Sequence, residues 1–349
     1  MKIQKAELVA KLNKIKGVVP KKTKMPVLQG ILVKEGYLIA NNMEMTVKAK
    51  LEGIEDECFI IPEKAFDLIS NLPDGEVDIS VTSENTITIK ADKIKNKYRT
   101  MDAALFPTID AQEEKNILTI KADILLESMK RVSYAVPAQG SNPAMSSVCL
   151  QAAEGKLNFV GLDGHVLAWD KVEYEGEFEL LIPKNTVDNL KSLGISGDVQ
   201  IQYNNTSARF ITDQFEVYTR LVEGKYFKYE TMFKELPLHT VVSRSNLLDA
   251  MTRAKMCTEE KCPVIFELKG RSWSLSIKDS TSDYHEIVDM QDEIQKMLTI
   301  GFNAKLVLET LKAFDCNNIR ISFSDPKMPM VIEAEDSDFK AIVLPVAIK

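Results

Sequence analysis

QKAELVAKLNKIKGVV (residues 4–19), KADILLESMKRVSYAV (121–136) and SRSNLLDAMTRAKMCT (243–258) are three versions of one pattern, spaced about 120 residues apart. In each stretch apolar residues recur at the spacing of an amphipathic helix, as they do at Leu8, Leu12 and Ile15 in the first. The chain is therefore expected to contain three repeats, each of which opens with a helix.

A second helical stretch follows each opening stretch. These stretches are IPEKAFDLISNL (61–72), IPKNTVDNLKSL (182–193) and FNAKLVLETLKAF (302–314). Pro62 and Pro183 are expected to mark helix starts, because the first turn of a helix needs no amide donor.

Between the helical stretches the sequence alternates with the period of a strand. Examples are TITIKA (86–91), KLNFVGL (156–162), VQIQY (199–203), WSLSIK (273–278) and IRISF (319–323). Each repeat should combine two helices with antiparallel strands, since a sheet with one wet face offers its other face to helices. We expect an α+β fold in three domains, at residues 1–115, 116–236 and 237–349.

The composition predicts a folded, cytoplasmic protein. A chain of 349 residues with 45% apolar and 27% charged residues is too long for one ordinary core and too apolar to be disordered. It has no secretory signal pattern at its start and no apolar run of the roughly 18 residues that span a membrane. Its five cysteines are scattered singly, so we expect reduced thiols, no metal and no cofactor.

The net charge of −7 at first argues against binding to nucleic acid, but the distribution of the charges along the chain does not. Over the six helical stretches basic residues outnumber acidic ones by seven, which leaves −14 for the rest of the chain. Positive helices with an acidic remainder suit a protein that surrounds DNA, because attraction to phosphate does not depend on base sequence. A solvated helix face remains an alternative explanation of the same charges.

An enzymatic function would start from Asp163 and His165, which could share one face of a strand. Neither a nucleophile elbow, a glycine-rich phosphate loop nor a metal-spaced histidine set accompanies them. We therefore expect no catalytic residues.

Five segments in order resemble the bacterial β sliding clamp family, and the resemblance covers the whole chain. They are KKTKMPVLQGILV (21–33), NNMEMTVKA (41–49), LDGHVLAWD (162–170), RLVEGKYFKYETMF (220–233) and AIVLPVAIK (341–349). The resemblance implies a head-to-tail homodimeric ring with helices lining the hole. Such a clamp encircles duplex DNA and tethers the replicative DNA polymerase, and it meets the polymerase, the clamp loader and repair proteins through short linear motifs. It has no catalytic activity of its own.

Three groups of site residues follow from the resemblance, position by position. DNA contact is expected at Lys21, Lys22, Lys24, Lys64 and Gln139. A pocket for partner peptides is expected at Met145, Leu162, Gly164, His165, Val166, Leu167, Phe227, Thr231, Met232, Pro329, Met330, Leu344, Pro345, Val346, Ala347 and Ile348. The dimer interface is expected at Tyr98 of one subunit and at Met256, Cys257 and Thr258 of the other.

The chain departs from the family pattern at several of these places. Val166 and Ala347 stand where relatives have arginines, so the pocket should offer fewer charged contacts. Pro143 and Ala144 replace residues that are aromatic in some relatives. A repeat scaffold that binds proteins but forms no ring remains an alternative, which a monomeric state in solution would indicate.

Overall fold

The structure is a computed structural model that describes residues 1–83, 85–107, 116–138, 140, 142–257, 262–278 and 282–348. Its internal contacts divide the chain into two compact units, Met1–Leu126 with Asn185–Leu221 and Glu127–Lys184 with Val222–Lys349. Each expected domain limit falls inside one of these units, because a sheet continues across each limit.

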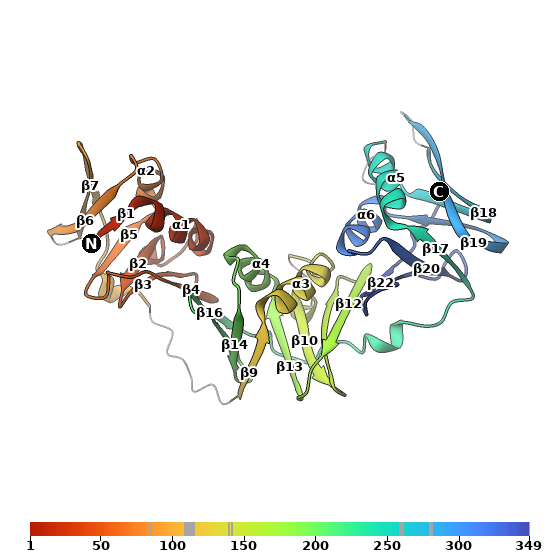
Figure 1. Ribbon diagram of the computed structural model, residues 1–349, viewed down its shortest axis with the longest axis horizontal. Helices are drawn as coiled ribbons and strands as arrows, with labels where there is room; N and C mark the ends of the chain where they lie inside the picture. The colour runs from red at the N-terminus through yellow and green to blue at the C-terminus, as the bar shows by residue number, and fades with distance from the viewer. Residues whose placement is uncertain are drawn as a thin grey trace. The chain divides into compact units, whose positions relative to one another are not determined.

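The first unit contains two antiparallel sheets, in the orders β1-β6-β7-β8 and β5-β2-β3-β4-β16-β15-β14-β9 (Figure 1). Its strands are β1 (Lys2–Gln4), β2 (Gly30–Lys34), β3 (Tyr37–Asn41), β4 (Met45–Lys50), β5 (Cys58–Pro62), β6 (Glu76–Ser83), β7 (Thr86–Ala91), β8 (Ile94–Arg99), β9 (Asn116–Lys121), β14 (Asp198–Tyr203), β15 (Ser207–Ile211) and β16 (Phe215–Arg220). Its helices are α1 (Lys5–Ile15), α2 (Phe66–Ser70) and α4 (Lys184–Leu193), of which Lys184 belongs to the second unit. The start of α3 (Ala122–Ser133) also lies in the first unit. Its short 3-10 turns are η1 (Lys16–Val18), η2 (Pro26–Leu28), η3 (Glu63–Ala65) and η4 (Ala103–Leu105).

The second unit contains an antiparallel sheet in the order β13-β10-β11-β12-β22-β21-β20-β17 and a long two-stranded pair, β18-β19. Its strands are β10 (Ser147–Ala153), β11 (Lys156–Leu162), β12 (Val166–Glu173), β13 (Phe178–Pro183), β17 (Leu238–Ser243), β18 (Val264–Lys278), β19 (Asp283–Phe302), β20 (Asn318–Phe323), β21 (Met330–Ala334) and β22 (Lys340–Val343). The rest of α3, α5 (Arg244–Met256), α6 (Ala304–Ala313) and the 3-10 turns η5 (Pro143–Ser146) and η6 (Glu230–Met232) complete it.

Both eight-stranded sheets arise where the edge strand of one repeat pairs with the edge strand of the next. In the first unit β4 pairs with β16, and in the second β12 pairs with β22, each time in antiparallel register. Successive repeats are thus joined by main-chain hydrogen bonds, which leave no open strand edge at either junction.

The predicted opening helices are confirmed, and their apolar stripes face the core. Leu8, Leu12 and Ile15 of α1 are buried, and α1 contacts α2, β3 and β4. In the same way α5 contacts α6, β17, β18 and β19. The α+β arrangement expected from the alternating periods is therefore the one observed.

The start of the second helices differs in detail from the prediction. Pro62 and Pro183 are the last residues of β5 and β13, and helical structure begins one residue later. Pro62 has a ψ of 148°, which is extended backbone, so it precedes the first turn instead of forming part of it. The second helix of the first repeat is also short, because η3 takes its first turn.

Three basic side chains donate hydrogen bonds to backbone carbonyls at or just beyond the ends of helices. Lys14 Nζ donates to the carbonyl of Ser192 at 3.1 Å, and Lys184 Nζ donates to that of Ser133 at 2.8 Å. Arg244 Nε donates to the carbonyl of Cys316 at 2.9 Å, just beyond α6. At Ser192 and Ser133 the cation satisfies a carbonyl in the last turn of a helix and complements the helix dipole.

Candidate functional site

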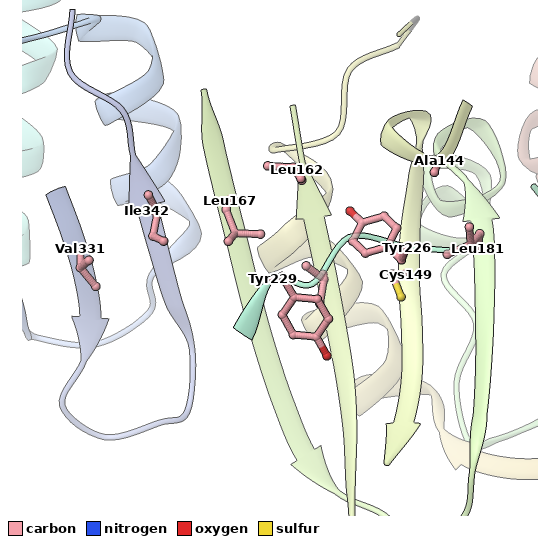
Figure 2. Packing of buried hydrophobic residues seen from close by; sticks show 10 residues of the cluster. Ala144, Cys149, Leu162, Leu167, Leu181, Tyr226, Tyr229, Val331 and Ile342 are labelled. Atoms are coloured by element: carbon pink, nitrogen blue, oxygen red, sulfur yellow. The ribbon is translucent and has the colours of Figure 1, made fainter. Parts of the chain in front are cut away.

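The floor of the candidate site is a row of four apolar residues across the second unit's eight-stranded sheet. Leu162 on β11 pairs with Leu167 on β12, Leu167 with Ile342 on β22, and Ile342 with Val331 on β21. Directly paired residues point to the same face of a sheet, so the four side chains form one continuous apolar strip. All four are buried, in a cluster with Tyr226 and Tyr229 (Figure 2).

One wall of the site is the segment that connects β16 to β17, and two buried tyrosines hold it against the sheet. Figure 2 shows Tyr226 and Tyr229 of this segment in front of the strands. Tyr229 Oη donates to Gln151 Oε1 at 2.6 Å, and its ring packs edge-on against Trp169 at 5.0 Å between centroids. Burial raises the pKa of the Tyr229 phenol, so it stays a neutral hydrogen-bond donor.

A second wall is the tight turn between β11 and β12. Asp163 Oδ1 accepts hydrogen bonds from the backbone N–H groups of His165 and Val166, at 2.8 and 2.7 Å, and Gly164 has a φ of 86°. The carbonyl of His165 accepts from the N–H of Leu344 at 2.8 Å, which ties the turn to the segment after β22. Asp163 therefore shapes the turn, and the His165 side chain is exposed beside the groove.

These walls enclose a groove of about 560 Å³. Its lining includes these residues of the expected pocket: Met145, Leu162, Gly164, His165, Val166, Leu167, Phe227, Thr231, Met232, Pro329 and Leu344. It also includes residues that the sequence had not indicated, which are Lys234, Leu236, Met328, Val331 and Ile342. We call this cavity the apolar groove.

Five residues of the expected pocket are not among those that line the apolar groove: Met330, Pro345, Val346, Ala347 and Ile348. Met330 is fully buried, because neighbouring strand residues face opposite sides and Val331 takes the groove side. Beyond Leu344 the chain leaves the groove, since the N–H of Val346 donates to the carbonyl of Gly301 at 2.8 Å.

The lysines expected to contact DNA are exposed in the first unit. Lys21, Lys22 and Lys24 lie in the loop before η2, and Lys64 lies in η3. Gln29 connects the two places: its Nε2 donates to the carbonyl of Lys21 at 3.1 Å, and its own carbonyl accepts from the N–H of Glu63 at 2.9 Å. Gln139 lies outside the described residues.

Several lysines of α1 that contribute to the positive helix charge make contacts within the protein. Lys5 pairs with Asp74 at 3.1 Å, and Lys14 holds the end of α4. Lys11 donates to Gln214 at 2.5 Å and lies over the ring of Phe215, and burial lowers its pKa. Excess charge on a helix therefore does not mean that every cation on it is available to DNA.

The described residues expected at the dimer interface are at least partly accessible to solvent. Tyr98 is part of β8, the last strand of its sheet, and is half-buried. Met256 ends α5 with 80% of its surface exposed, which is high for a large apolar side chain, and Cys257 follows it. Thr258 lies outside the described residues.

The described part of the chain offers no grouping of three or more His, Cys, Asp or Glu side chains that could hold a metal ion. Among the helices in that part, none has the length and apolar character to cross a membrane.

Comparisons with known proteins agree with these observations. Three family models match in succession: the N-terminal domain of the DNA polymerase III beta subunit at residues 1–110, its central domain at 119–228 and its C-terminal domain at 234–347. The beta sliding clamp of Pseudomonas putida is 26% identical over 98% of both chains, and that of Bacillus subtilis is 23% identical over 99% of this chain and 98% of its own.

Solved structures have the same fold. A sliding clamp of Pseudomonas aeruginosa bound to griselimycin superposes with a TM-score of 0.91 at 24% identity, covering 100% of this chain and 99% of its own. The sliding clamp of Bacillus subtilis gives 0.91 at 21% identity over the same shares.

Repeated α+β domains that share antiparallel sheets edge to edge, with an apolar groove on one of these sheets, define the architecture of the chain. With its three domain models in order along nearly all its length, the chain belongs to the DNA polymerase III beta subunit family.

Proposed function

We propose that the chain is a cytoplasmic DNA sliding clamp that encircles duplex DNA and tethers the replicative polymerase for processive synthesis. The ordered match of all three domains of the beta subunit family carries this proposal. A clamp holds DNA by topology, so its contacts with phosphate can stay weak and it can slide, whereas tight base contacts would stall it.

Two subunits would close the ring head to tail through two strand edges that lack a second neighbour in the described part of the chain, β8 and the first half of β19. The junctions β4–β16 and β12–β22 use one edge strand from each of two successive repeats. Within the described residues, β8 pairs with β7 alone, and the first half of β19 pairs with β18 alone. A second copy would pair these two edges and form a closed, symmetric assembly.

These two edges carry opposite charges, which supports their pairing. β8 presents the exposed residues Lys95, Lys97 and Arg99, whereas the first half of β19 presents the exposed residues Asp283 and Asp289. Such complementarity favours association of the two edges and disfavours pairing of either edge with itself. The exposed Met256 would be covered in the same interface.

The apolar groove would bind short linear motifs of polymerase, clamp loader and repair proteins. Its floor is a strip of aliphatic side chains, and its rim includes the exposed side chains of Met232 and Leu344. A few apolar anchors in such a groove usually supply most of the binding energy of a peptide. Binding of an uncharged motif should therefore depend little on salt.

The exposed residues Lys21, Lys22, Lys24 and Lys64 would contact phosphate, with Gln139 as a further contact. Lysines on a surface loop act as mobile point charges, which attract the duplex without fixing its sequence or position.

A matched pair of tail variants tests the groove. Leu344 lines it and is 37% exposed, whereas Ile348 does not line it and is 43% exposed. In fluorescence anisotropy with a labelled Gln-Leu-Xaa-Leu-Phe peptide, Leu344→Ala should weaken binding about ten-fold, which is the loss expected for one buried aliphatic anchor. Ile348→Ala should bind like the unchanged protein. Equal affinities for the two variants would show that the peptide binds elsewhere.

A further inference from the structure

The floor of the apolar groove continues beyond Val331 and changes character there. Val331 pairs with Ser322 on β20, and Ser322 pairs with His239 on β17, in the same row as Leu162, Leu167 and Ile342. The polar part of the row lies in a second hollow of about 490 Å³. Lys234, Leu236 and Val331 line both cavities, so the two adjoin.

Three cationic side chains line this second hollow, which we call the basic hollow. They are Lys234, Arg320 and Lys340, together with two carboxylates, Glu235 and Glu333. Lys234 and Arg320 are exposed, and the structure shows no ion pair between either of them and another described residue, although Glu333 stands directly opposite Arg320 on the neighbouring strand. Both are therefore available to a ligand.

Lys340 is held in place by aromatic rings. Its Nζ lies 4.1 Å from the ring centroid of Trp169 and 4.4 Å from that of Phe233. Two ring faces attract and orient the ammonium group without neutralising it. Burial lowers the pKa of Lys340, with Glu333 acting in the opposite direction. A nearby carboxylate from a ligand would favour its charged form.

We propose that the basic hollow binds a carboxylate that a partner peptide carries next to its apolar anchors. The proposal rests on the proposed function of the apolar groove, and it adds a preference for motifs flanked by acidic residues. A peptide whose anchors fill the groove and whose chain continues past Val331 reaches Lys234 and Arg320 directly. Since the hollow adjoins the groove along one side, acidic residues on one flank of the motif should matter and those on the other flank should not.

The test compares labelled peptides with one apolar core. One peptide has uncharged flanks and blocked ends, two carry a pair of aspartates before or after the core, and one has a free terminal carboxylate after it. We expect one aspartate peptide to bind about five-fold tighter than the uncharged peptide at low salt, with the gain lost at high salt. A gain with the free terminus instead would identify a chain end as the ligand.

Arg320→Glu should remove the gain and leave affinity for the uncharged peptide unchanged. Arg271→Glu is the matched control, because Arg271 is equally an exposed arginine on a strand but lines neither cavity. Equal affinity for all four peptides, or a gain in affinity from the aspartates that survives Arg320→Glu, would overturn the inference. Failure of the uncharged peptide to bind would instead contradict the groove itself, so the two failures are distinguishable.

Discussion

A charge reversal at Lys22 tests the proposed contact with DNA. It is exposed in a loop of the first unit, where reversal of its charge should cost little folding free energy. We expect Lys22→Glu to slow loading onto DNA by a cognate clamp loader, most strongly at low salt, because phosphate attraction is screened by ions. Lys50→Glu, at another exposed lysine, is the control. Unchanged loading of Lys22→Glu at low salt would contradict this contact.

Single residues that line the groove were predictable where they lie in a segment that resembles a family motif, such as Leu162 and Leu167 in LDGHVLAWD. Val331 and Ile342 were missed, because their place in the floor depends on the register of strands distant in sequence. Met330 was among the expected pocket residues and Val331 was not, and a shift of one residue in a strand reverses which side chain faces the groove.

A substitution at Gly161 tests the packing of α3 against β11, because the helix crosses the strand there. A β-carbon on Gly161 would lie 2.3 Å from the carbonyl oxygen of Val132 and 3.0 Å from Val136 Cγ2. Backbone atoms of a helix cannot move aside cheaply, so Gly161→Ala should lower the free energy of unfolding by about 2 kcal/mol. Gly17→Ala, with no atom within 4 Å of its added carbon, is the control in urea unfolding. A similar loss in both variants would refute the close crossing.

Helices and strands were largely predictable from periodicity, because each buries one stripe or face. The opening helices agree with α1, α3 and α5, and the alternating segments agree with strands such as β7 and β11. The wall formed by the segment between β16 and β17 was not predictable as a wall, since it has no regular period and is held by tertiary contacts of Tyr226 and Tyr229. Pairing of edge strands between repeats likewise leaves no local sequence signal.

A substitution at Tyr98 tests whether two subunits assemble through β8. A charge at Tyr98 in the proposed β8 contact would be buried without a partner, so Tyr98→Asp should give monomers. Val81→Asp, at a residue that is 55% exposed on the inner strand β6 of the same sheet, should remain dimeric. Size-exclusion chromatography with light scattering reads out both variants. A Tyr98→Asp protein that stays dimeric would exclude this placement, and a monomeric unchanged protein would favour a scaffold that forms no ring.

Retention on circular DNA shows whether the protein is linked to DNA by topology. The labelled protein would be loaded by a cognate clamp loader onto nicked circular DNA, freed of unbound protein by gel filtration, and the DNA then cut once. We predict that the protein stays with the circle through filtration at moderate salt and leaves when the DNA becomes linear, because a sliding ring escapes from a free end. Equal retention on circular and linear DNA would show that the protein binds DNA by surface contact and does not encircle it.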